Sequence, residues 1–240
     1  MNNSEFRALY ITLLVALFLS SVSIAAAQST IVTVPSTDVV SEKNVYLEFD
    51  YISHYANHHE SGFQSYVPRV VVGVGHDIEV GANLVYTDGF GVNQPIEIQP
   101  DLKWRFYRSE GQGVAAAVGI MLYAPVTHRG GTDTFLMPYA VVSKKVAGKY
   151  GPRLTGGGYA LVGRSAGTGD RGGVIAGYEQ PMAPRVSFVM DWFSGRNRFG
   201  YVTPGLSFTT TKRSLLYTGY SIGNQGRRNN ALFTYYGITF

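Results

Sequence analysis

The 240-residue chain contains no cysteine, which excludes a disulfide framework, a cysteine-bearing zinc site and a thiol nucleophile. Charged residues are scarce as well, because they make up 15% of the chain against about 25% in ordinary soluble domains. Hydrophobic residues nevertheless reach 45%, which is too much for a disordered polymer. Together with 17 tyrosines, 13 phenylalanines and 29 glycines, these deficits indicate a folded protein whose surface does not face water everywhere.

The N-terminus has the pattern of a cleavable secretory signal peptide. A largely apolar run at 8–19 is followed by small residues that end in three alanines at 25–27. This pattern predicts cleavage before Gln28. The alternative is an N-terminal anchor, but a dozen mostly apolar residues are fewer than the roughly 20 that span hydrocarbon as a helix. No later stretch of about 18 apolar residues predicts a transmembrane helix.

The remaining chain alternates apolar and polar residues with the period of two that is typical of β-strands. The clearest run spans residues 96–106. One face of this run carries Ile98, Leu102, Trp104 and Phe106, and the other carries Glu97, Gln99, Asp101, Lys103 and Arg105. One face of such a strand is therefore apolar, while the other holds formal charges.

The same alternation along the rest of the chain predicts about twelve strands, each near the 9–11 residues that a tilted strand needs to cross a bilayer. Tight turns roughly alternate with longer polar loops, as in outer-membrane barrels. We therefore predict an all-β, closed antiparallel up-and-down transmembrane barrel, with ten strands as the alternative count. The predicted starts are Asn44, Gln64, Asp77, Ile96, Val114, Thr134, Arg153, Gly172, Arg185, Tyr201, Ser214 and Ala231.

The predicted domains are a signal peptide at 1–27, a segment at 28–43 and the barrel at 44–240. The middle segment is expected to be a short periplasmic stretch or a partial plug of the barrel. A secreted β-sandwich or lipocalin-like barrel would show the same alternation with its apolar face inside. Aromatic residues at strand ends favour the membrane barrel, because they would form interfacial girdles. These residues are Tyr51, Tyr86, Trp104, Phe106 and Trp192.

The C-terminal sequence ALFTYYGITF has apolar or aromatic residues at Leu232, Tyr236, Ile238 and Phe240. This ending resembles the C-terminal strand of Gram-negative outer-membrane proteins, although Thr234 departs from the pattern. The resemblance implies that the protein lies in the cell outer membrane. It also implies that the barrel-assembly machinery is a partner and that Phe240 is the assembly signal.

A shorter stretch at 67–86 resembles a hairpin of the outer-membrane transporters grouped as the MetA pathway of phenol degradation. The resemblance rests on Arg69, Gly75, Asp77, Glu79 and Gly81, with Gly75 one position closer to Asp77 than the pattern has it. It implies a transport function. From the residues alone, Glu79 faces inward opposite the strand of Arg69, where an internal ion pair would stiffen the hairpin.

The inward face is expected to carry charges of both signs along a narrow lumen. This predicts a passive channel or transporter for small polar or anionic solutes, because basic residues gather near the periplasmic mouth. The alternative is a structural or lipopolysaccharide-binding barrel with a filled lumen. The predicted lumen-lining residues are Glu48, Asp50, Arg69, Glu79, Glu97, Asp101, Lys103, Arg105, Lys144, Glu179, Arg185 and Asp191.

The longer loops are rich in arginine, and guanidinium groups bind phosphate in bidentate fashion. Contact with outer-membrane lipid and lipopolysaccharide is one expectation, and an ordinary solvated loop surface is the other. Nucleic acid is excluded as a partner, because the chain is exported and has no dense basic stripe. The predicted lipopolysaccharide contacts are Arg164, Arg171, Arg196, Arg198, Arg227 and Arg228.

Enzyme signatures are sparse, and we predict no catalytic residue, metal site or cofactor. His58 and His59 are adjacent in the first loop, where neighbouring histidines rarely converge on one ion. An outer-membrane lipase or rim protease is the least favoured alternative. Its loop candidates would be His128, Asp133 and Asp170, which no motif marks out.

Overall fold

The computed structural model describes residues 29–57, 60–89, 94–127, 134–163, 169–226 and 229–240. No helix in these ranges is long and apolar enough to cross a membrane. The signal peptide and several residues that the sequence brought forward lie outside the described ranges. These residues are His58, His59, His128, Asp133, Arg164, Arg227 and Arg228.

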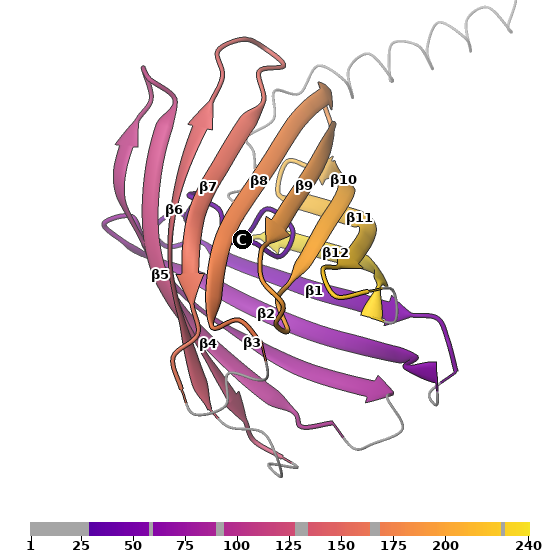
Figure 1. Ribbon diagram of the computed structural model, residues 1–240. Coiled ribbons are helices and arrows are strands. Elements are labelled where there is room, and N and C mark those ends of the chain that lie inside the picture. Colours follow the sequence, from indigo (N-terminus) through magenta and orange to yellow (C-terminus); the bar gives the residue numbers. More distant parts are fainter. Residues whose placement is uncertain (1–28, 58–59, 90–93, 128–133, 164–168, 227–228) are drawn as a thin grey trace, which may run out of the picture.

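Twelve antiparallel strands close into one barrel (Figure 1). Each strand pairs with the next in sequence, and the last pairs with the first. The predicted fold and strand count are confirmed, and every strand begins within one residue of its predicted start. The strands are β1 (Val45–His54), β2 (Phe63–Gly75), β3 (Ile78–Gly89), β4 (Glu97–Ser109), β5 (Val114–Pro125), β6 (Phe135–Lys145), β7 (Arg153–Ala160), β8 (Gly172–Ala183), β9 (Val186–Phe193), β10 (Tyr201–Thr211), β11 (Ser214–Gly223) and β12 (Ala231–Thr239).

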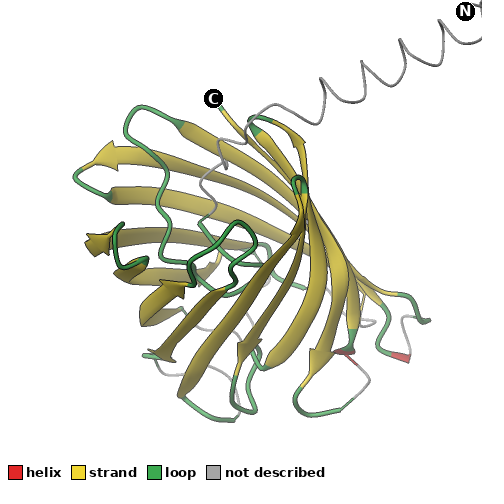
Figure 2. Cartoon of the chain, turned by 90° about the horizontal axis from the view of Figure 1, so that it is seen from above, coloured by secondary structure: helices red, strands yellow, loops and turns green. Residues whose placement is uncertain are grey.

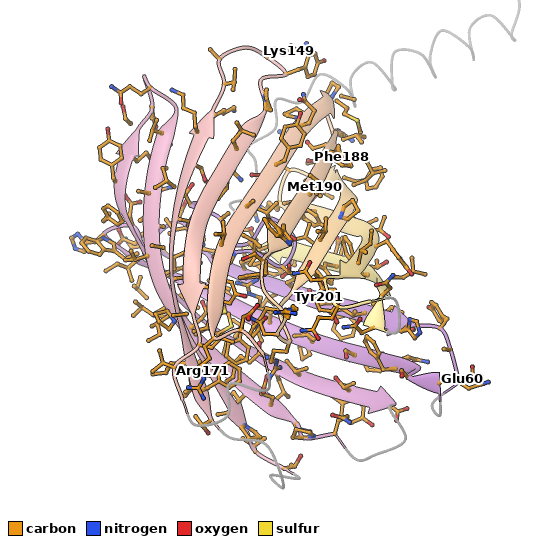
Figure 3. The ribbon with its side chains drawn as sticks, viewed as in Figure 1. Glu60, Lys149, Arg171, Phe188, Met190 and Tyr201 are labelled. Carbon is orange, nitrogen blue, oxygen red and sulfur yellow. The ribbon has the colours of Figure 1, made fainter. Side chains whose placement is uncertain are left out.

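The period of two sets the two faces of the barrel wall. Along β4, Leu102 and Trp104 are 46% and 47% exposed, whereas Lys103 between them is fully buried. Strand β9 follows the same rule, with Met190 exposed and Asp191 buried (Figure 3). The apolar stripe therefore faces outward and the charged stripe faces the lumen, which is the arrangement of a membrane barrel and the reverse of a soluble sandwich.

The two ends of the barrel differ in their connections. Short turns at 76–77, 184–185 and 212–213 lie at the end that includes Lys149, and the longer loops lie at the end of Glu60 and Arg171 (Figure 3). Both His76 and Asp77 have positive φ angles, 54° and 58°, as a type I′ hairpin turn requires. Short turns face the periplasm in outer-membrane barrels, so we name the long-loop end the outer end and the opposite one the inner end.

The N-terminal segment at 29–43 runs through the interior of the barrel, inside the ring of strands (Figure 2). Ile31, Val32 and Val34 are at most 3% exposed and pack among inward-facing side chains of the wall. Val40 packs on Tyr46 of β1 and Val71 of β2. The hydrophobic core of this barrel therefore lies in the lumen and is built around the segment.

Candidate functional site

The tip of the N-terminal segment is held by one carboxylate of the wall. Asp191 Oδ2 accepts hydrogen bonds from the backbone N–H groups of Val32, Thr33 and Val34 at 2.9, 2.7 and 2.8 Å. The Thr33 hydroxyl donates to Asp191 Oδ1 at 3.2 Å. The tip is folded into a tight hairpin by the Ile31 N–H, which donates to the Val34 carbonyl. Since hydrogen bonds to an ionised acceptor are strong, Asp191 anchors this hairpin.

A second anchor joins the segment to a buried ion pair. Lys103 Nζ lies 2.9 Å from Glu79 Oε1, and both side chains are fully buried. Lys103 also donates to the Ser29 carbonyl at 2.8 Å, while the Ser29 hydroxyl donates to Glu79. The Val40 N–H donates to Glu79 Oε2 at 2.6 Å. The pair is therefore satisfied by both ends of the segment, as buried charges require.

A third anchor lies toward the inner end. Arg153 donates to Asp38 at 2.5 Å and also binds both carboxylate oxygens of Glu179. Burial by itself raises the pKa of Asp38, but Arg153, with smaller contributions from Lys103 and Arg105, leaves this pKa below its ordinary value of 3.8. Beside it, the Thr37 hydroxyl donates to Ser143 at 2.9 Å. Asp38 is therefore a charged contact of the segment.

Gly73 of β2 lies where the backbone of the N-terminal segment crosses the barrel wall before it joins β1. Lys43 N–H donates to the Gly73 carbonyl at 3.1 Å, and Gly73 N–H donates to the Asn44 carbonyl at 3.1 Å. A methyl group at Gly73 would overlap the carbonyl oxygens of Val40 and Ser41. Glycine is therefore required here because another backbone crosses over it.

Toward the outer end, the lumen opens into a cavity of about 550 Å³, which we call the outer vestibule. The hairpin tip forms part of its floor through Thr30, Val32 and Thr33. About half of its lining residues are apolar or aromatic, and the others are polar or charged, so the cavity combines an apolar surface with several hydrogen-bonding groups. Prominent wall residues are Ile52, Phe63, Met121, Tyr123, Phe193 and Tyr235.

The floor of the outer vestibule carries charge. Arg69 of β2 lies 3.4 Å from Glu48 of β1, and Tyr46 donates to the same carboxylate at 2.5 Å. Asp50, one inward position further along β1, also lines the cavity. Its Oδ1 and the Nε of Arg69 are buried and have no hydrogen-bond partner among the residues that the structure describes. The floor therefore holds one acceptor and one donor that are buried beside the cavity without a partner in the described part of the chain.

The loop at 194–200 bends over the vestibule. Arg198 donates two hydrogen bonds to Glu97, at 2.9 and 3.0 Å, and its guanidinium lies 5.2 Å from the ring centre of Tyr123. Phe199 packs edge-on against Tyr123 at 5.1 Å. Asn197 donates to the Tyr159 hydroxyl at 2.8 Å. These contacts narrow the outer mouth of the lumen.

Most of the predicted lumen-lining residues point into the barrel, but two pairings differ from expectation. Glu79 pairs with Lys103 of β4, its direct partner in the β3–β4 ladder, and Arg69 pairs with Glu48. Lys144 is exposed at the inner rim, where it donates to the Gln112 carbonyl, because the inward positions of β6 are the odd-numbered ones. The inward set comprises Glu48, Asp50, Arg69, Glu79, Glu97, Asp101, Lys103, Glu179 and Asp191.

The remaining predicted residues lie at the ends of the barrel. Arg105 pairs with Asp77 at 2.5 Å at the inner rim, and Arg185 lies half-buried in the turn before β9. Of the loop arginines that the structure describes, Arg171 and Arg196 are exposed at the outer end. Arg198 is exposed as well, but its guanidinium pairs with the largely buried carboxylate of Glu97 at the wall of the vestibule.

Phe240 lies at the seam where the barrel closes. Its N–H donates to the Val45 carbonyl at 2.8 Å, and the Val45 N–H donates to the Phe240 carbonyl at 3.1 Å. Its side chain is 60% exposed.

Several residues that hold the segment were not predicted from the sequence. Ser29, Asp38 and Arg153 belong to this group, as do Thr37 and Ser143. Arg153 starts a strand at an inward position, which the alternation could have revealed. The residues of the segment itself sit in an irregular stretch, where no period indicates which way a side chain points.

No family model matches the sequence, and no curated protein matches it. Among solved structures, the KdgM porin superposes with a TM-score of 0.55 at 7% identity, over 81% of this chain and 98% of the porin. The COG4313 outer membrane channel from Pseudomonas putida F1 superposes at 0.50 and 15% identity, over 82% and 94%. KdgM porin in complex with disordered oligogalacturonate gives 0.52 at 8% identity, over 82% and 98%. At such identities the likeness shows the fold, which is that of these channel barrels.

Proposed function

We propose that the protein is an outer-membrane barrel that acts as a narrow passive channel or transporter for small polar solutes. The apolar belt of the wall suits lipid, and the inward face offers charges and hydrogen-bonding groups to a solute. The observation that carries the proposal is the outer vestibule of about 550 Å³, which ends on the polar floor of Glu48, Asp50 and Arg69. Solutes would enter there from the outer end.

The segment at 29–43 sets how narrow the pathway is. Its hairpin tip lies across the lumen below the vestibule and bonds to Asp191, while its two ends bond to Glu79 and Lys103. With the segment docked, conductance should be small and intermittent. Displacement of the segment should widen the pathway without disturbing the strands, because the wall residues keep their cross-strand pairs.

The ion pairs of the lumen weaken the preference for anionic solutes that the sequence suggested. The basic residues near the inner end are largely neutralised, since Lys103 pairs with Glu79, Arg105 with Asp77, and Arg153 with two carboxylates. This reduces the positive potential on which a preference for anions would depend. The ion selectivity of the channel measures this balance directly.

The test is conductance of the purified, folded protein in a planar lipid bilayer. We expect small discrete steps, and larger steps when residues 29–40 are deleted from the mature chain. Silence of both proteins at high protein load, with folding verified by circular dichroism, would contradict the channel. A reversal potential in a salt gradient then gives the cation-to-anion ratio.

A structural or lipopolysaccharide-binding barrel is the second candidate. It is favoured by the packed core around Ile31 and Val34. The exposed Arg171 and Arg196 at the outer end would contact lipid phosphates. Loss of lipopolysaccharide association on replacing both arginines, combined with bilayer silence, would favour this role.

Three finer proposals rest on the sequence. The hairpin at 67–86 suggests membership of the MetA-pathway transporter group. The barrel-assembly machinery would recognise Phe240, so deletion of Phe240 should reduce the fraction of folded protein in cells. We also propose that the protein has no enzymatic role, for which the measurement is an absence of lipase and protease turnover by the folded protein.

A further inference from the structure

Carboxylates outnumber cations around the floor of the outer vestibule. The Arg69 guanidinium interacts with Glu48, Asp50 and Asp101, but its ion pair is with Glu48. Lys103, the next cation inward, pairs with Glu79. Neither Asp50 nor Asp101 forms an ion pair with any residue that the structure describes. Asp50 and Asp101 therefore share the attraction of the Arg69 guanidinium, which is already paired with Glu48.

Asp50 and Asp101 each also have one buried oxygen that accepts no hydrogen bond within the part of the chain that the structure describes. Asp50 Oδ1 and Asp101 Oδ2 are buried and have no partner among the described residues. Asp101 is 8% exposed, and Asp50 lines the cavity itself. A buried polar atom without a partner is rare and calls for an explanation, such as an unfilled ligand position.

The charged residues nearer the outer end of the vestibule do not offset the excess of carboxylates at its floor. Arg198 is the other cation of the cavity lining, and its guanidinium is taken up by Glu97 through two hydrogen bonds. It also lies 5.2 to 5.5 Å from the ring centres of Tyr123, Phe135 and Phe199. The aromatic wall thus already contacts one organic cation, through the attraction between a cation and a ring face.

We propose that the outer vestibule binds organic cations, with a protonated amine at Asp50 and an apolar or aromatic body against the wall. This inference deepens the proposed function, since it names the class of solute that the channel takes up. Asp101 lies further inward along the same face of the lumen and continues the negative potential. A ligand hydroxyl or carbonyl would meet the Nε of Arg69.

Anions and bare metal ions fit this cavity less well. An anion that approached Arg69 would also approach the carboxyl groups of Glu48 and Asp50, which line the same cavity, and negative charge there repels it. A bare inorganic cation would find the carboxylates but would leave the apolar wall of Ile52, Phe193 and Tyr235 without a partner. An amine with an apolar body uses both features.

Binding to the folded protein in detergent tests this inference with three probes that share one body. The probes are 2-phenylethylammonium, 2-phenylethanol and 3-phenylpropionate, measured by isothermal titration calorimetry at fixed ionic strength. We expect the amine to bind about tenfold more tightly than the alcohol, because one charge-assisted contact is at stake, and the carboxylate to bind most weakly. Asp50→Asn should reduce amine affinity about tenfold, with no change for the alcohol.

Asp88→Asn is the matched control. It removes the same charge from the outer end of β3, where Asp88 is exposed and does not line the cavity. Amine affinity should stay within about twofold of the wild-type value, because an exposed charge is screened. Asp101→Asn serves as a second test variant if Asp50→Asn fails to fold.

Equal affinity for the amine and the alcohol would overturn the inference, as would an Asp50→Asn variant that binds the amine normally. Displacement of the amine by equimolar potassium would indicate an inorganic cation site instead. These results are separable from the channel function. Specific amine binding with a silent bilayer refutes the channel alone, whereas conductance without amine discrimination refutes this inference alone.

Discussion

Glu79 and Lys103 are direct cross-strand partners in β3 and β4, fully buried, with Oε1 and Nζ 2.9 Å apart. The hydroxyl and carbonyl of Ser29 and the N–H of Val40 complete the contacts of this pair. One ion pair therefore ties the wall of the barrel to the segment that fills it.

Glu79→Gln should destabilise the barrel strongly. The substitution leaves the Lys103 ammonium buried without its counter-ion, which costs about 3–5 kcal/mol in comparable cases. Urea unfolding in lipid vesicles, followed by tryptophan fluorescence, gives the free energy of unfolding. Glu110→Gln is the control, because its partner Arg108 is exposed and such pairs contribute about 0–1 kcal/mol. Equal losses in the two variants would contradict the assigned importance of the buried pair.

Asp191→Asn should loosen the hairpin tip while the barrel stays folded. The amide keeps an oxygen acceptor but loses the charge that strengthens the three N–H contacts of 32–34. We expect more frequent open events in single-channel recordings and faster proteolysis within 29–43. Ser187→Ala changes another inward residue of β9 and should alter neither. An unchanged open probability in Asp191→Asn would show that this carboxylate does not hold the segment.

Gly73→Val should displace the segment by steric overlap. Its side chain would meet the carbonyl oxygens of Val40 and Ser41, so the segment has to leave its position. Conductance should rise toward that of the deletion variant. Gly156→Val is the matched control, since Gly156 of β7 is exposed and a Cβ there meets no described atom within 4 Å. The prediction fails if both valines raise conductance alike.

Acidification should release the inner anchor of the segment. The pKa of Asp38 lies below 3.8 in the docked segment, because Arg153, Lys103 and Arg105 together outweigh the effect of burial. A lowered pKa stabilises docking fully above the ordinary value and loses this contribution as the pH falls through the lowered one. The contribution of Asp38 to docking should therefore be constant over roughly pH 5–8 and be lost below about pH 3.8, where conductance should rise.

Asp38→Asn separates this anchor from general acid effects. Without an ionisable group at 38, the variant should show a higher conductance near neutral pH and a weaker response to acid. A wild-type channel whose conductance rises between pH 5 and 7 would assign the pH dependence to other groups.

Arg196 and Arg198 should have opposite roles although they are two residues apart. Arg198→Ala removes the contact with Glu97 and the aromatic wall, so the outer mouth should widen and conductance should increase. Arg196→Ala should leave conductance unchanged, because Arg196 does not line the outer vestibule. Lipopolysaccharide association, measured by co-purification, should weaken only for Arg196→Ala. If both variants changed conductance and lipopolysaccharide association in the same way, Arg196 and Arg198 would not have the separate roles predicted here.

The sequence by itself determined the strands and their faces. The alternation from Glu97 to Phe106 is a local property, since successive side chains on a strand point to opposite sides whatever the strand pairs with. The start of each strand and the outward position of Leu102 and Trp104 were therefore predictable. The tight turns between strands were visible for the same reason, because they depend on neighbouring residues alone.

The tertiary structure alone decided which charges meet. Glu79 pairs with Lys103 because the β3–β4 register places them opposite each other, whereas the sequence suggested the strand of Arg69. Asp191 meets a segment that lies more than 150 positions earlier in the chain. Such contacts depend on closure of the barrel and on a backbone without periodicity at 29–43. Side-chain alternation fixes which face a residue occupies, but only the closed lumen fixes its partner.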